Sequence, residues 1–314
     1  PIMPKVSVIV PNHNYGRFLP QRLESILSQT FQNMEVILLD DCSTDNSQAV
    51  LSQYATHPLV SRIVFNEKNS GSPFAQWRKG IDLAQGEYVW IAESDDYCEP
   101  TLLATLVRAL DQYPTASIAF AGAVLVDENG KPTGREFDYW HRHEDGSVRF
   151  YPSKSYLRKL LMWRCSVYNA AGVLFRRDLY LQIDKRYAGL RYCADWLFWI
   201  EMALRGDVVE VRKKLNRFRI HNDSVTARSE KTKGVFEEQL IIAHRLWTLP
   251  FIGSYRLSLA RGAFYKKIKR MFPDVQNRKE PMQRAKALGV KRSDYVLERI
   301  IKSIHQVIPF LYHS

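Results

Sequence analysis

Two adjacent carboxylates, Asp95 and Asp96, follow a short apolar run, residues 88–92. A run of this length predicts a buried strand, and the carboxyl end of such a strand is where open α/β sheets bind ligands. Two neighbouring carboxylates can also bind a hard divalent cation, which usually holds the phosphates of a substrate. The alternative is a solvated turn before the next helix, because a lone Asp-Asp pair is a short motif with many chance matches.

A further carboxylate, Asp195, lies in an aromatic segment, residues 192–201. Apolar residues at positions 197, 200 and 204 follow helical spacing, which places Asp195 in the first turn of a predicted helix. The helix dipole favours a carboxylate there. By position alone, Asp195 is typical of an ordinary charge at the start of a helix.

His221 is the third residue whose side chain could take part in catalysis or metal binding. It follows residues 217–220, in which Phe218 and Ile220 alternate with arginines. This alternation predicts a strand that delivers His221 into a crevice, where its imidazole could bind a metal ion. A lone histidine is, however, more often a hydrogen-bonded polar group than a metal ligand.

The first part of the chain must position these residues, and it alternates predicted strands with predicted helices. The strands are residues 5–10, 35–39, 62–65 and 88–92, and amphipathic helical patterns separate them. Such alternation predicts parallel pairing with right-handed crossovers, so the loops after the strands converge at one edge. We therefore expect Asp41, Asp45, Arg78 and the Asp95–Asp96 pair to face one crevice.

Nucleotide binding is the physical expectation for a crevice at this edge of a parallel sheet. The glycine motifs GxGxxG and GxxxxGK[ST] do not occur in the chain. Their absence argues against a nicotinamide dehydrogenase and against a P-loop ATPase. Carboxylates, a metal ion and Arg78 would then have to hold the nucleotide.

Five segments of the chain together resemble the signatures of family 2 glycosyltransferases of the bacterial polysaccharide and O-antigen type. In order, they are residues 5–14, 39–45, 69–71, 76–80 and 93–96. The resemblance covers roughly residues 4–228. It implies the GT-A fold, a Rossmann-like, mostly parallel central sheet with helices on both faces. It also implies an inverting transferase that uses a nucleotide sugar.

The resemblance further implies roles at the donor site. It assigns Pro11, His13 and Asp41 to the base pocket, and Arg78 to the neighbourhood of the diphosphate. Asp95 would contact the ribose and Asp96 the metal ion, Mn²⁺ or Mg²⁺. His13 replaces the more usual tyrosine and Lys79 replaces a frequent asparagine, which leaves the base preference open. The alternative for His13 is a surface loop residue, and for Arg78 a solvated helix face.

Roles in catalysis are implied in the same way. Asp195 corresponds to the family's catalytic base, although Ala194 replaces the acid that usually precedes it. Trp196 would stack on the acceptor sugar. His221 lies in a segment similar to the family's R-x-H-x-x-S-x-T motif and would complete the metal shell. The base would take a proton from the attacking hydroxyl, while the cation would stabilise the departing nucleoside diphosphate.

Composition bounds the class of protein. The chain has 314 residues, 46% of them hydrophobic, which is enough for one large domain with an appendage. Its four cysteines form no CxxC pair, so we expect reduced thiols, with neither a disulfide framework nor a zinc site. No apolar run approaches the roughly 18 residues of a membrane span, and no signal peptide is recognisable. We expect a cytoplasmic protein, with peripheral attachment to the inner face of the cell membrane as the alternative.

The net charge of +12 is unevenly distributed. From residue 212 to the end there are 23 Lys and Arg against 8 Asp and Glu, while residues 1–211 are nearly neutral. We expect a catalytic domain at residues 1–228 and a basic, amphipathic helical region at residues 229–314. Such helices either attract anionic lipid or pack on the body with a solvated basic face.

The predicted partners are a nucleotide-sugar donor and a saccharide or lipid-linked saccharide acceptor. UDP is the expected nucleotide carrier. The alternative function is a nucleotide-sugar-binding module that has lost catalysis, or a membrane-surface interaction protein, which the substitutions at positions 79 and 194 allow. No nucleic acid is expected as a partner, because the chain carries no RNP, helix-turn-helix or zinc-finger pattern.

Overall fold

A computed structural model describes residues 3–136, 138, 144–221 and 232–307 of the chain. The chain divides into two compact units. Unit 1 comprises Pro1–Tyr156 and Cys165–Ala227, and unit 2 comprises Leu157–Arg164 and Arg228–Ser314. The predicted boundary at residues 228 and 229 falls outside the described residues, so that domain assignment stays a prediction.

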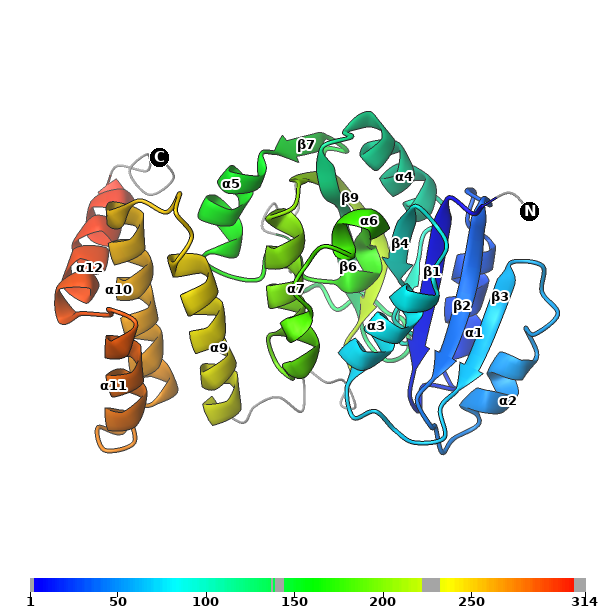
Figure 1. Ribbon diagram of the computed structural model, residues 1–314, viewed down its shortest axis with the longest axis horizontal. Helices are drawn as coiled ribbons and strands as arrows, with labels where there is room; N and C mark the ends of the chain where they lie inside the picture. The colour runs from blue at the N-terminus through cyan, green and yellow to red at the C-terminus, as the bar shows by residue number, and fades with distance from the viewer. Residues whose placement is uncertain (1–2, 137, 139–143, 222–231, 308–314) are drawn as a thin grey trace. The chain divides into compact units, whose positions relative to one another are not determined.

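The core of unit 1 is a single mixed sheet, which has nine strands within the described residues (Figure 1). Its order is β3-β2-β1-β4-β8-β6-β9-β5, with β7 paired to β9. The strands are β1 (Val6–Asn12), β2 (Met34–Asp40), β3 (Val60–Phe65), β4 (Tyr88–Ile91), β5 (Tyr97–Cys98), β6 (Ala116–Val126), β7 (Val148–Tyr151), β8 (Val173–Arg176) and β9 (Asp207–Arg219).

The first four strands pair in parallel, as the alternating pattern predicts. The sheet becomes mixed beyond β4, because β8 runs antiparallel to both β4 and β6. A short 3₁₀ helix, η2 (Ala170–Gly172), directly precedes β8. The predicted α/β class is confirmed by this mixed central sheet and the helices around it.

Helices cover both faces of this sheet. Those of unit 1 are α1 (Leu19–Leu27), α2 (Ser47–Ser52), α3 (Pro73–Leu83), α4 (Leu102–Gln112), α5 (Ser153–Tyr156), α6 (Arg177–Tyr180), the 3₁₀ helix η3 (Lys185–Gly189) and α7 (Ala194–Ala203). Alternate residues of β1 point to opposite faces. Val6, Val8 and Val10 pack in the same core cluster as the apolar residues of α1, α2 and α4. On the other face, Gly80 lets α3 approach Ile9, because a Cβ at that glycine would lie 2.3 Å from the isoleucine Cγ2.

Strand β1 continues through Pro11 to Asn12, two residues beyond the predicted range of residues 5–10. In a parallel strand the N and O of one residue face the same neighbour. On the β4 side, the O of Ile9 accepts from the N of Ala92, and the O of Pro11 accepts from the hydroxyl of Ser94. Because β4 has already ended at Ile91, no ladder partner there requires an N–H from position 11.

Unit 2 contains the helices α9 (Thr232–Trp247), α10 (Ser254–Met271), α11 (Lys279–Ala287) and α12 (Arg292–Val307), together with the π-helical turn η1 (Leu157–Leu161). Its buried core centres on Phe236, Leu240, Ile268, Ala285 and Val290. Helix α12 crosses α10 closely, because a Cβ at Gly262 would lie 2.3 Å from the carbonyl O of Asp294. Among the helices of the described residues, none combines the length and the apolar character that a bilayer crossing requires.

Candidate functional site

The loops after β1 and β2 are joined by side-chain hydrogen bonds. The side-chain oxygen of Asn14 accepts from the backbone N of Thr44 at 2.7 Å, and Asp45 accepts from the backbone N of Gly16 at 2.9 Å. Asn14 and Cys42 both adopt left-handed backbone conformations with φ of 58°. Non-glycine residues reach this region only at some energetic cost, so the surrounding contacts must hold both loops in place.

Asp41 is the centre of the first cluster at this edge. Its carboxylate accepts from the amide of Asn66 at 2.7 Å, from the backbone N and hydroxyl of Ser70, and from the amide of Gln76 at 3.0 Å. Its backbone O lies 2.9 Å from Nδ1 of His13. The structure therefore brings His13 and Asp41 together, as predicted for a base pocket. The Asp41 carboxylate already accepts hydrogen bonds from these residues and thereby fixes the segment before α3.

Arg78 lies on the exposed side of α3 rather than within that cluster. Its guanidinium forms an ion pair with Asp82 at 3.9 Å. The neighbouring Lys79 donates to the amide oxygen of Asn66, which in turn contacts Asp41. The described contacts do not connect Arg78 to Asp95 or Asp96, so its role near a diphosphate stays a prediction.

Asp96 is buried, and both of its oxygens accept hydrogen bonds. Oδ1 accepts from the backbone N of Arg219 at 2.9 Å. Oδ2 accepts from the side-chain amides of Asn169 at 3.0 Å and Asn216 at 3.3 Å. Burial, and then the negative charge of Asp95, raise the pKa of Asp96 to about 7. Through these hydrogen bonds, Asp96 joins the loop after β4 to β9 and to the start of η2.

Asp95, unlike Asp96, contacts His221. Its Oδ2 lies 3.0 Å from Nε2 of His221, at the carboxyl end of β9. The imidazole is fully buried between the rings of Tyr15, at 5.3 Å, and Phe18, at 5.4 Å. The Asp95 side chain retains 17% exposure. The structure thus brings together a partly exposed carboxylate and a histidine 126 residues apart in sequence.

Arg219 holds the backbone of this carboxylate loop. Its Nε donates to the backbone O of Asp95 at 2.7 Å, and its terminal nitrogens donate to the backbone O of Glu128 and to the side chain of Gln21. The guanidinium also stands 4.5 Å from the ring centroid of Phe18. Because Arg219 is only 2% exposed, this charge is stabilised by its partners rather than by solvent.

Glu93 begins the same loop and faces α3. Its Oε1 accepts from the indole N–H of Trp77 at 2.7 Å. Burial, and then the charge of Asp95, raise the pKa of Glu93 to about 8. The fully buried guanidinium of Arg22, 5.0 Å from the ring centroid of Trp90, opposes this shift.

Asp195 occupies the first turn of α7, as the spacing predicts. Its Oδ1 accepts from the backbone N of Trp196 at 2.7 Å, and the thiol of Cys165 lies 3.9 Å from its Oδ2. Trp196 itself is partly exposed. The helix is joined to α3 by aromatic contacts, since the ring of Phe198 lies 5.6 Å from that of Trp77.

One short segment links the two carboxylate centres. Cys165 contacts Asp195, and Asn169, four residues later, donates to Asp96. Four residues span at most about 14 Å of extended chain. Asp195 and the Asp95–Asp96 loop therefore contact the same short segment of unit 1, and the role of Asp195 as a base stays a prediction.

A divalent cation fits part of this arrangement. Among the residues that the structure describes, no three His, Cys, Asp or Glu side chains are grouped as metal ligands. Asp95 and His221 supply a pair, and Nδ1 of His221 is buried without a hydrogen-bond partner in the described part of the chain. Mg²⁺ usually takes one or two protein carboxylates and completes its shell with substrate phosphates and water. The residues present are compatible with a cation that is shared with a substrate.

Sequence reasoning missed Asn169, Asn216 and the guanidinium of Arg219. Asn216 could have been identified from the sequence, because it lies within the β9 segment and a buried side-chain amide in a strand needs a hydrogen-bond partner. The hydroxyl-bearing residues that follow His221 in the predicted R-x-H-x-x-S-x-T motif lie outside the described residues.

Comparison with known proteins identifies the family. The model for "Glycosyl transferase family 2" matches residues 7–183, which is more than half of the chain. The chain belongs to glycosyl transferase family 2. The glycosyltransferase GlyG of Streptococcus pneumoniae is 37% identical over 124 residues, 40% of this chain and 40% of GlyG. An uncharacterized glycosyltransferase of Escherichia coli K12, YibD, is 29% identical over 227 residues, 71% of this chain and 63% of YibD.

A solved structure shares the fold of this family 2 chain. Residues 1–349 of Staphylococcus aureus TarS, in complex with UDP-GlcNAc, superpose with a TM-score of 0.65. The match covers 86% of this chain and 73% of that chain, at 20% sequence identity. At this identity the likeness establishes the fold alone. The curated relatives named above extend well beyond the part that this chain matches.

Proposed function

We propose that this family 2 protein transfers a sugar from a nucleotide sugar to a hydroxyl group of a saccharide or lipid-linked saccharide. The observation that carries the proposal is the placement of Asp95 and His221 at one sheet edge, linked through Asn169 and Cys165 to Asp195. The UDP-GlcNAc complex of TarS, which has the same fold, supports a UDP-linked donor.

Asp95 is the better candidate for the cation-binding carboxylate. Both oxygens of Asp96 already accept N–H groups, and a cation there would have to displace buried amides. Asp95 already contacts His221 and remains partly exposed. We therefore assign Asp95 and His221 to Mn²⁺ or Mg²⁺, in place of Asp96. When bound, the cation would stabilise the negative charge of the departing nucleoside diphosphate.

The protein's own residues supply the other steps. His13, Pro11 and Asp41 border the base, in a pocket whose loops are fixed by Asn14 and Asp45. Asp195 takes the proton of the acceptor hydroxyl as it attacks the anomeric carbon. Attack in line with the departing diphosphate inverts the anomeric configuration and requires no covalent enzyme intermediate. Trp196 offers a partly exposed aromatic face for the acceptor sugar.

Release of nucleoside diphosphate from a panel of nucleotide sugars tests this function. The panel is run with and without Mn²⁺ and with saccharide acceptors. We expect UDP release from at least one UDP-sugar, faster with the metal and with an acceptor. Metal-dependent donor binding without turnover, on any acceptor or on water, would instead identify a binding module.

Unit 2 is proposed to dock on anionic lipid. Residues 228–314 carry 18 Lys and Arg against 7 Asp and Glu. On α12, Val296, Ile300 and Ile304 recur every four residues with 48%, 51% and 38% of their surface exposed. A helix with an apolar stripe among basic residues binds the interface of an anionic bilayer. This docking would place the enzyme at the inner face of the cell membrane, next to a lipid-linked acceptor.

A further inference from the structure

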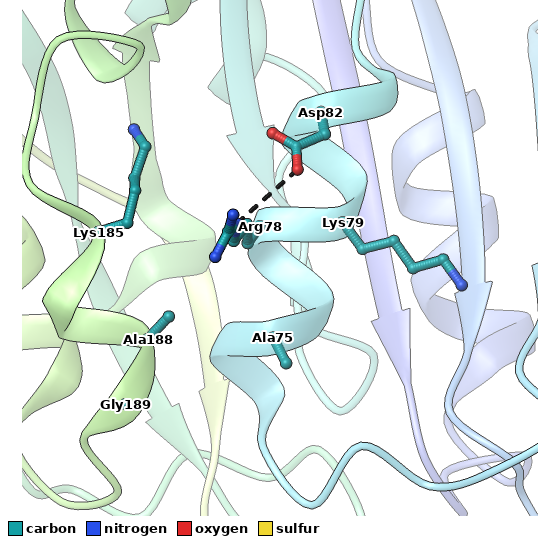
Figure 2. Close-up of a pocket in the computed structure, with 7 residues that line it drawn as sticks. All are labelled: Ala75, Arg78, Lys79, Asp82, Lys185, Ala188 and Gly189. Atoms are coloured by element: carbon teal, nitrogen blue, oxygen red, sulfur yellow. Dashed lines mark ion pairs between the residues drawn. The ribbon is translucent and has the colours of Figure 1, made fainter.

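An open pocket lies between α3 and η3, entirely within unit 1 (Figure 2). Its volume is about 470 Å³, within the range typical of small-ligand sites. Helix α3 contributes Ala75, Arg78, Lys79 and Asp82, and η3 contributes Lys185, Ala188 and Gly189. Ala75 on α3 and Ala188 and Gly189 on η3 have small side chains or none, which leaves open space beside the charged side chains.

The charged groups around this pocket are mainly cationic. In Figure 2, the Arg78 side chain extends from α3 toward η3, while Lys79 points to the opposite side of the helix. The ammonium of Lys79 meets Asn66 there. Arg78 and Lys185 therefore face the pocket with a single carboxylate, Asp82, whose 3.9 Å ion pair with Arg78 is long and exposed. Such a pair contributes little and competes weakly with a ligand.

Lys185 is the less solvated of the two cations. Its ammonium donates to the backbone O of Tyr180 and stands 3.3 Å from the centroid of that ring. Burial, with a smaller contribution from the charge of Arg78, lowers the pKa of Lys185 to about 8, although the charges of Asp82 and Asp184 oppose the shift. Two cations held near each other in a partly desolvated pocket are stabilised by an oxyanion between them.

The two walls of the pocket also lead to the candidate active site. Trp77, one residue before Arg78, donates to Glu93 in the carboxylate loop. Gly189 precedes Asp195 by six residues, which span at most about 20 Å. A saccharide that reaches Asp195 with its reactive hydroxyl can therefore extend along η3 to this pocket.

We propose that the pocket between α3 and η3 binds an oxyanion, a carboxylate or a phosphate, carried by the saccharide acceptor. This inference rests on the proposed transferase function and adds that the acceptor is acidic. Arg78 would then serve the acceptor rather than the donor diphosphate.

Ligand-observed NMR titration of the full chain tests the pocket directly. The probes are glucuronate, glucose 1-phosphate and neutral glucose, each in the presence of saturating UDP so that the donor site is occupied. The variants are Lys185→Gln and Arg78→Gln. The matched control is Lys213→Gln, an exposed lysine on β9. UDP affinity and the melting temperature of each variant verify that the fold and the donor site are intact.

We expect at least one acidic probe to bind the unmodified protein, and neutral glucose not to bind. Lys185→Gln and Arg78→Gln should each weaken that binding about tenfold, the size of one lost charge-assisted hydrogen bond. Lys213→Gln should leave it unchanged. The probe that binds identifies the oxyanion as a carboxylate or a phosphate.

Three results would overturn the inference: no acidic probe binds, glucose binds equally well, or folded Lys185→Gln retains full affinity. Binding that appears only when UDP is omitted would place the anion in the donor site and also overturn it. If the unmodified protein fails to bind UDP, the UDP-linked donor of the proposed function is refuted. The same titrations without UDP then decide independently whether the pocket binds an oxyanion.

Discussion

Replacing Arg219 by methionine should destabilise unit 1 strongly and disturb the donor site at the same time. The guanidinium makes hydrogen bonds to the backbone O of Asp95 at 2.7 Å and of Glu128 at 2.7 Å, and to the side chain of Gln21 at 2.6 Å. Methionine preserves much of the side-chain volume but none of these donors. The substitution leaves three buried or partly buried oxygen acceptors without their partner.

The expected loss follows from these contacts. A hydrogen bond from a charged donor contributes about 1.5–3 kcal/mol, and removal of a buried cation recovers part of its desolvation cost. We expect the free energy of unfolding to fall by about 4 kcal/mol. Since Arg219 holds the Asp95 carbonyl, metal-dependent UDP affinity should fall as well.

Arg217→Met is the matched control on the same strand. Its guanidinium pairs with Glu99 and is 23% exposed, so we expect a loss of about 1 kcal/mol or less. Urea unfolding followed by tryptophan fluorescence measures the stability of both variants, and calorimetry with UDP and Mn²⁺ measures binding. Equal losses in the two variants, or an Arg219→Met protein with normal stability and UDP affinity, would refute the role given to Arg219.

Further substitutions separate chemistry from structure. Asp195→Asn should leave UDP affinity within about twofold and lower turnover by on the order of 10²-fold or more, because it removes the proton acceptor; unchanged turnover excludes the role. Asp95→Asn should abolish the Mn²⁺ dependence of UDP binding, whereas Asp96→Asn should mainly lower the melting temperature; the reverse pattern returns the metal to Asp96. Asp138 is buried, which raises its pKa to about 6, above the ordinary 3.8. The folded state then keeps a proton that the unfolded state has lost, so stability falls as pH rises from about 4 to 6. Asp138→Asn should remove up to about 3 kcal/mol of that fall, measured as unfolding free energy against pH; a parallel pH profile contradicts this. Flotation with anionic liposomes should recover the protein at low salt and less of it at moderate salt. Ile300→Glu should weaken the recovery, and failure to float at either salt concentration excludes lipid docking.

The sequence by itself determined the α/β class and the positions of its first strands and helices. Apolar runs such as residues 88–92 end abruptly at polar residues, and this local contrast is visible without coordinates. Helical spacing placed Asp195 in the first turn of α7. The motif order also indicated the family that the comparison confirms.

Only the tertiary structure distinguished the surroundings of the two adjacent carboxylates, Asp95 and Asp96. Asp95 and Asp96 are neighbours of the same type, and in the sequence only the family resemblance assigned them different roles. Their surroundings differ because β9, more than a hundred residues later, brings Asn216 and the backbone of Arg219 to one and His221 to the other. The α3–η3 pocket has the same origin, since Arg78 and Lys185 border one pocket only because distant segments pack together. Local propensity specifies an element, whereas the environment of a side chain depends on contacts that the chain makes only when folded.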